Sequence, residues 1–279
     1  MLRRNIGLMF LNYDDYPLKS TPFTVNQLVH TARLSLTDWG FCALPNILSP
    51  DALRLVQDEA YGLVERRRND LFRYEEYHDV YLGPGGDLKT SRTVAPGDMI
   101  PVNSVLKQMH SCPLLTNFLE KIIGKKLVPS PDPLGGVSID YYFPGDGLAW
   151  RFDNRQKYLV HLLIMDPDRS NLYNGGSFEY ANTPDMTDAR TPYMEGKIRK
   201  LVTDHYQIRE SRVRYLDPLL PTGTLWVFRA SQYCHRISPV RRIKIMEGNE
   251  DDIPARIEAV FYYGEDLVDQ KKNFGRTAS

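Results

Sequence analysis

Apolar residues in the first part of the chain recur every three or four positions, the spacing of one face of a helix. The pattern predicts helices over 24–40 and 49–68, the second opening at Ser49-Pro50. Proline suits the first position of a helix because its missing N–H has no partner there in any case. Two shorter helices are predicted over 104–110 and 113–123.

The segments between these helices lack helical periodicity. The apolar run 41–47 predicts a strand, whereas residues 69–102 are rich in turn formers, with Gly-Pro-Gly-Gly at 83–86. Loops of this length are often functional, for example as lids. We therefore expect 69–102 to be a long loop beside a site.

From about residue 126 the pattern changes to short β-type runs separated by glycine and proline. Several such strands favour a closed or double-sheet architecture, which means a sandwich, a barrel or a jelly roll. The polar segment 181–220 is expected to be an irregular insertion between strands. The predicted strands are 137–143, 158–165, 176–180, 224–228, 235–240 and 256–263.

These elements predict an α+β protein that is mainly β with flanking helices. We expect a single domain over residues 1–279, a length that suits one large domain. A helical layer and loop would form 1–125, the β core 126–264 and a tail 265–279.

Composition narrows the function classes. The 35 basic and 35 acidic residues cancel, which argues against bulk electrostatic binding to nucleic acid or to an anionic membrane. The three cysteines are widely spaced without a CxxC pair, which fits a reducing compartment. No targeting segment or apolar stretch of membrane-spanning length is evident. We expect a cytoplasmic protein with a small-molecule partner; its oligomeric state is unknown.

Three segments of the β half carry the candidate chemistry: PGDGLAWRFDN at 144–154, GGSFEY at 175–180, and PTGTLWVF with CHRISPV at 221–240. In this order and spacing, together with RIEAVFYY at 256–263, they resemble the 2-oxoglutarate-dependent Fe(II) oxygenases of the double-stranded β-helix (jelly-roll, cupin-like) fold. The resemblance covers about 100–264. It is strongest to the prolyl-hydroxylase-type branch, which includes small-molecule hydroxylases and halogenases.

The resemblance implies a set of site residues and cofactors. That family holds Fe(II) with two histidines and a carboxylate, leaving positions for 2-oxoglutarate and O₂. Asp153 matches the carboxylate ligand and His235 the distal histidine. Arg256 matches the cation that binds the distal carboxylate of 2-oxoglutarate, and we prefer it to Arg241 and Arg242 because it opens the last strand.

One residue departs from the family pattern. Arg151 stands where the family has its first histidine, and arginine has no lone pair with which to bind a metal. A cation about 4 Å from Fe(II) would be repelled by roughly 8 kcal/mol at an effective dielectric constant of about 20. Arg151 therefore points away, pairs with Asp153 or excludes the iron. Three explanations of Arg151 compete: a natural loss of the histidine, an introduced substitution, and a substitute ligand elsewhere in the chain.

The other histidines are the candidates for a substitute ligand. His161, on the strand after the first motif, is either a core histidine, a ligand or a substrate contact, and Trp150 is either a core residue or part of the pocket wall. Cys234 is expected to pack rather than to bind metal because neighbouring strand residues face opposite ways. The remaining histidines are expected to be structural or on loops: His30, His78, His110 and His205.

The resemblance implies an oxidoreductase, a dioxygenase that hydroxylates, desaturates or cyclises a small molecule such as an amino acid. The carboxylate Asp153 argues against halogenation, since halogenases of this family lack that ligand. The alternative is a non-catalytic protein of the same fold that binds 2-oxoglutarate or another carboxylate between Arg151 and Arg256, or serves as a partner subunit.

Overall fold

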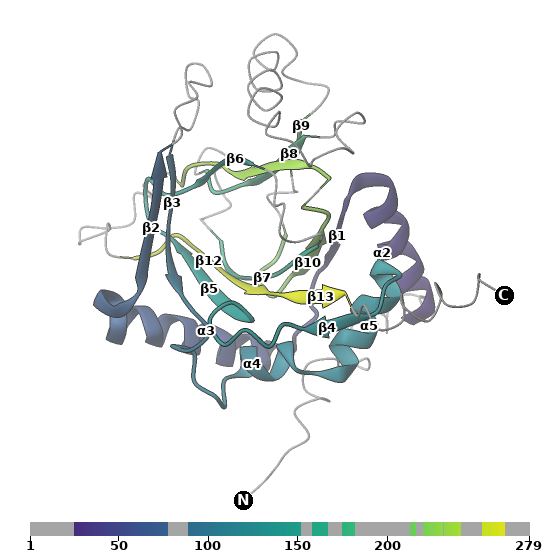
Figure 1. Cartoon of the computed structure of the whole chain (residues 1–279), viewed down its shortest axis with the longest axis horizontal. Helices are drawn as coiled ribbons and strands as arrows, with labels where there is room; N and C mark the ends of the chain where they lie inside the picture. The colour runs from purple at the N-terminus through teal and green to yellow at the C-terminus, as the bar shows by residue number, and fades with distance from the viewer. Residues whose placement is uncertain are drawn as a thin grey trace, which may run out of the picture.

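The fold is two antiparallel sheets that face each other, with helices against the outside of the larger one (Figure 1). The computed structural model describes residues 25–77, 89–151, 158–166, 175–181, 213–215, 220–230, 232–240 and 253–265. Within these ranges the helices are α2 (Val25–Trp39), α3 (Pro50–Arg67), the 3-10 turn η2 (Arg68–Asp70), α4 (Val105–His110) and α5 (Pro113–Ile123).

The larger sheet has the strand order β1-β10-β7-β12-β5-β3-β2 and the smaller one β6-β11-β8-β9, while β13 and β4 form a separate pair. In chain order the strands are β1 (Phe41–Leu44), β2 (Phe72–Tyr77), β3 (Lys89–Ala95), β4 (Leu127–Pro129), β5 (Val137–Tyr142), β6 (Leu148–Arg151), β7 (Leu159–Met165), β8 (Phe178–Ala181), β9 (Val213–Tyr215), β10 (Leu225–Phe228), β11 (Cys234–Ile237), β12 (Arg256–Phe261) and β13 (Tyr263–Glu265).

The helices cover the outer face of the seven-stranded sheet. The Ser49 side chain caps α3 by accepting a hydrogen bond from the Ala52 N–H at 3.2 Å. The Tyr141 hydroxyl of β5 donates to the carbonyl oxygen of Ala60 in α3 at 2.8 Å, which ties the helix to the sheet. A first apolar core fills this layer, with Val56 of α3 and the outward side chains of the central strands fully buried.

A second core lies between the two sheets. Strand residues alternate in direction, so Trp226 and Phe228 of β10 face the smaller sheet while Leu225 and Val227 face the helices. Phe178 of β8 meets Trp226 with ring centroids 4.7 Å apart. The inner face of the larger sheet therefore faces the smaller sheet across this second core, where several polar side chains are also buried.

The predicted α+β class and double-sheet core are confirmed, but the prediction of one long loop over 69–102 is wrong. Strands β2 and β3 pair along their whole length, and β3 joins β5. Their sequences, FRYEEY and KTSRTVA, are too polar for a hydrophobic pattern because β2 is the edge strand and most of its side chains are exposed. The predicted helical layer therefore also contributes three strands to the larger sheet.

No helix in the described part of the chain is both long and apolar enough to cross a membrane.

Candidate functional site

Arg151 and His235 lie directly opposite each other. Arg151 closes β6, and its Cα pairs in register with that of His235 on β11. His235 is buried, with 1% of its surface exposed, and Arg151 is partly buried. The structure thus brings together two of the residues singled out from the sequence. Asp153, the expected carboxylate ligand, lies outside the described residues.

The environment of His235 keeps its imidazole neutral. Burial, with the nearby Arg151 charge, lowers the pKa of His235 to about 3. Its Nδ1 lies 3.1 Å from the carbonyl oxygen of Tyr233, which only accepts hydrogen bonds, so Nδ1 carries the proton. Nε2 then presents a lone pair, and this buried atom has no hydrogen-bond partner among the described residues. His235 has the chemistry of a metal ligand.

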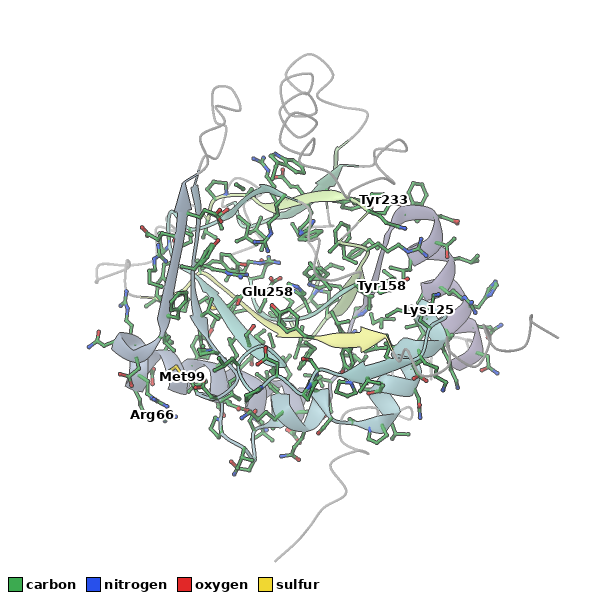
Figure 2. All side chains as sticks on the ribbon, in the orientation of Figure 1. Arg66, Met99, Lys125, Tyr158, Tyr233 and Glu258 are labelled. Atoms are coloured by element: carbon green, nitrogen blue, oxygen red, sulfur yellow. The ribbon has the colours of Figure 1, made fainter. Side chains whose placement is uncertain are left out.

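Arg256 is present where the sequence predicts it, at the first residue of β12, and its guanidinium is already engaged. Nη1 donates to Asp166 Oδ1 at 2.7 Å, and Nη2 donates to Glu258 Oε1. Arg256 and Glu258 are two residues apart on one strand, so both side chains face the same side of the sheet. In Figure 2 the labelled Glu258 lies between the two sheets.

His161 belongs to the same network. Its Nδ1 lies 3.3 Å from Glu258 Oε2, and its ring stacks on Trp226 with centroids 4.1 Å apart. Its Nε2 is buried and, like that of His235, lacks a hydrogen-bond partner in the described part of the chain. Nδ1 of His161 is therefore fixed by the Glu258 carboxylate, whereas its Nε2 has no hydrogen-bond partner among the described residues.

A second buried ion pair lies on the neighbouring strands. Arg92 of β3 donates to Asp140 Oδ2 at 2.5 Å, and Asp140 is the register partner of Glu258. Burial alone would lower the pKa of Arg92, but the Asp140 carboxylate, together with Tyr142 and Tyr262, outweighs this and raises the pKa. Each of the two facing carboxylates is thus matched by an arginine of its own.

Trp150, a candidate substrate contact, lies on the other face of the smaller sheet. Its ring is 5.0 Å from the guanidinium carbon of Arg236, and Arg236 Nε donates to Glu179 Oε2 at 2.7 Å. Arg236 follows His235 in β11, so the two side chains point to opposite faces. The structure does not bring Trp150 together with His235 and Arg256.

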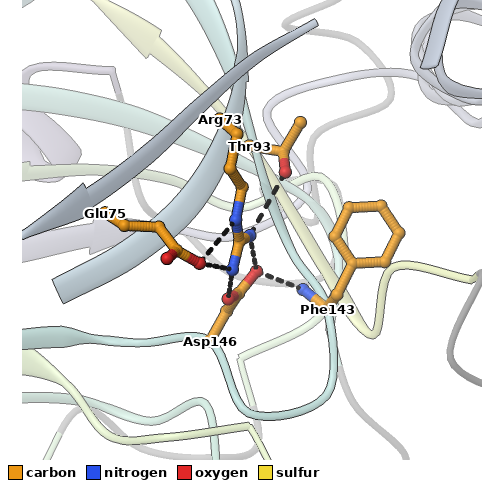
Figure 3. Close-up of polar contacts among 5 residues, drawn as sticks. All are labelled: Arg73, Glu75, Thr93, Phe143 and Asp146. Carbon is orange, nitrogen blue, oxygen red and sulfur yellow. Dashed lines mark hydrogen bonds and ion pairs between the residues drawn. The ribbon is translucent and has the colours of Figure 1, made fainter. Parts of the chain in front are cut away.

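Asp146, in the turn of the PGDGLAW segment, fixes the start of β6 (Figure 3). Its carboxylate accepts two hydrogen bonds from Arg73, at 2.7 and 2.6 Å, and one from the Phe143 N–H at 3.0 Å. Thr93 and Glu75 complete the arginine's contacts. Asp146 was not predicted, and its partner lies 73 residues away, so no local pattern marks the pair.

Glu258 was also missed, although the sequence carries a signal for it. An acidic residue in the apolar run RIEAVFYY, at the spacing that puts it on the same face as Arg256, predicts a buried ion pair.

No family model matches the sequence, and no curated protein matches it either. Several solved structures do match this fold. A prolyl hydroxylase from Trichoplax adhaerens, in complex with a hypoxia-inducible-factor peptide, aligns with a TM-score of 0.56 over 93% of this chain and 96% of its own, at 12% identity. The non-heme α-ketoglutarate-dependent carbocyclase SnoK from nogalamycin biosynthesis aligns with a TM-score of 0.53 over 91% and 92%, at 12% identity.

AviO1 from Streptomyces viridochromogenes Tue57 aligns with a TM-score of 0.53 over 86% of this chain and 95% of its own, at 14% identity. Identities this low show the fold and nothing finer. The fold of this chain is the jelly roll of the 2-oxoglutarate- and Fe(II)-dependent oxygenases.

The described residues do not fit the Fe(II) and 2-oxoglutarate that the resemblance in sequence implies. His235 offers one ligand nitrogen, the opposing Arg151 offers none, and the described part of the chain holds no group of three or more His, Cys, Asp or Glu side chains that could bind a metal ion. Arg256, the expected partner of the 2-oxoglutarate carboxylate, is bonded to two carboxylates of the chain itself.

Proposed function

We propose that this chain carries the barrel of an oxidoreductase that acts on a small molecule with Fe(II), 2-oxoglutarate and O₂, and that Arg151 suppresses the iron-dependent reaction. Bound iron and 2-oxoglutarate would supply the oxidant; His235 and Asp153 are the ligands we assign. The register pair of Arg151 with His235 carries the proposal, because a fixed cation stands opposite the buried imidazole.

The small-molecule substrate is proposed on two grounds. Aromatic rings and paired charges, the groups that recognise small molecules, are buried between the two sheets. In addition, SnoK, which shares the fold, is a carbocyclase of nogalamycin biosynthesis.

Metal titration of position 151 tests the proposal. Fe(II) is titrated anaerobically, with a chromophoric chelator as competitor, into the chain, Arg151→His and Arg151→Gln. Glutamine removes the charge without adding a ligand, so it separates relief of repulsion from gain of coordination. We expect Arg151→His to bind one equivalent at least about 100-fold more tightly than the chain does, which is about 2.7 kcal/mol, with Arg151→Gln between them.

Adding His235→Ala to Arg151→His should abolish that gain. Equal iron affinity of the chain and Arg151→His, or a gain that survives His235→Ala, would show the assignment to be wrong.

A second candidate is an active iron site that His161 completes. The observation in its favour is that His161 and His235 are arranged alike, each with Nδ1 beside an oxygen acceptor and a buried Nε2 lacking a partner among the described residues. Metal-binding histidines commonly donate a hydrogen bond from their other ring N–H to a carboxylate or a carbonyl oxygen. Iron bound by the chain and lost on His161→Ala would favour this candidate over the first.

A further inference from the structure

The guanidinium of Arg256 is bound by carboxylates of the chain itself. Nη2 donates to Glu258 Oε1, and Nη1 donates to Asp166 Oδ1 at 2.7 Å. Arg256 and Glu258 share the inward face of β12, whereas Asp166 immediately follows β7. Each terminal nitrogen of the guanidinium therefore donates one hydrogen bond to a carboxylate of the chain, whereas the buried Nε has no hydrogen-bond partner among the described residues.

The Glu258 carboxylate is buried against Arg256 and away from water. Its side chain is 0% exposed and that of Arg256 6%, so water does not replace either partner. Burial alone would raise the pKa of Glu258, but the Arg256 charge and the His161 hydrogen bond outweigh it and hold the pKa at about 2. The carboxylate is ionised at neutral pH.

The local charge disfavours another anion. The Arg256 guanidinium already faces the two carboxylates of Glu258 and Asp166, and the neighbouring Asp140 is paired with Arg92. A third carboxylate at Arg256 would be repelled by these two anions or would have to displace one of them. Displacing a buried carboxylate from its arginine is unfavourable because its charge then has no partner.

We infer that Glu258 is an internal occupant of the Arg256 site and excludes the distal carboxylate of a dicarboxylate such as 2-oxoglutarate. Glu258 is then a specificity-determining residue. The inference rests on the proposed function only in taking Arg256 as the position that binds the co-substrate carboxylate.

Chemical rescue tests this directly, without metal. Glu258→Ala removes the internal carboxylate and leaves Arg256 and His161 facing the space it filled. Binding of 2-oxoglutarate is measured by calorimetry, and thermal stability is followed with propionate and with propionamide, a neutral probe of the same shape. We expect Glu258→Ala to bind 2-oxoglutarate at least about tenfold more tightly than the unaltered chain does. Propionate, but not propionamide, should raise its melting temperature.

Asp166→Ala keeps the test decisive if Glu258→Ala fails to fold. Asp166 follows the last residue of β7 and 13% of its side chain is exposed, so its removal frees Nη1 with less loss of core packing. The same carboxylate-dependent gains are expected. Glu179→Ala is the matched control, because it breaks the comparable Arg236 pair on the other face of the smaller sheet and should show no propionate effect.

Saturable 2-oxoglutarate binding by the unaltered chain that is lost on Arg256→Met would overturn the inference. So would the absence of any carboxylate effect in the folded variants. Because no iron is present, either result leaves the iron assignment of Arg151 and His235 untouched. Failure of the iron titration likewise leaves this one untouched.

Discussion

Removing the Asp146 side chain should destabilise the protein by about 3 kcal/mol. Asp146→Ala deletes the bidentate contact with Arg73 and leaves the Phe143 N–H, in a buried residue, without its acceptor. An unsatisfied buried N–H costs about 1–3 kcal/mol. The lost ion pair adds only about 1 kcal/mol, because the Arg73 side chain is 41% exposed and becomes hydrated.

Two variants apportion that loss. Asp146→Asn keeps an acceptor for the Phe143 N–H and should cost about 1 kcal/mol. Glu75→Gln weakens an exposed contact of the same arginine and should cost less than about 0.5 kcal/mol. Urea unfolding, with the slope checked for each variant, measures all three. If Asp146→Ala loses no more than Glu75→Gln, the turn is not fixed by this carboxylate and the reasoning is refuted.

Two further predictions concern stability. Gly147→Ala should lower the free energy of unfolding by more than about 2 kcal/mol, because the new Cβ would lie 2.9 Å from the carbonyl oxygen of Ile237. Gly264→Ala, whose Cβ would have its nearest atom at 3.9 Å, should change that free energy by less than about 0.5 kcal/mol. Urea unfolding measures both, and equal losses would contradict the prediction. Burial lowers the pKa of His110, so the unfolded chain takes up the proton first and stability falls as pH drops below about 6.5. His110→Gln, which can still donate to the Tyr262 carbonyl oxygen, should make that decline shallower in unfolding curves from pH 7 to 5, although the lowered pKa of His235 also contributes to it; an unchanged decline would contradict the prediction.

The sequence predicted what local rules determine. The predicted helix ends at Ser49 and Gly124 are where the structure has them, because a capping side chain and a left-handed glycine act within one turn. The inner strands were predicted from their apolar residues. Strands β2 and β3 were not, because β2 is a mostly exposed edge strand and the buried positions of β3 are largely filled by small polar residues: Thr90, Ser91 and Thr93.

The site was predictable only residue by residue. The sequence singled out Arg151, His235 and Arg256 through a family resemblance, and the structure places the first two opposite each other. No pattern in the sequence indicates that Arg256 is bound by Asp166, 90 residues away. Partners so distant in sequence are set by sheet topology rather than by local pattern, so the engaged state of the guanidinium emerges only from the fold.

The most direct test of the account is the Fe(II) dissociation constant of Arg151→His compared with that of the unaltered chain, both measured anaerobically and without 2-oxoglutarate. Arg151 stands opposite the buried His235, so replacing it removes a cation and adds a ligand at once. The account predicts one iron per Arg151→His chain and an affinity at least about 100-fold higher. Equal affinities of the two proteins would contradict it.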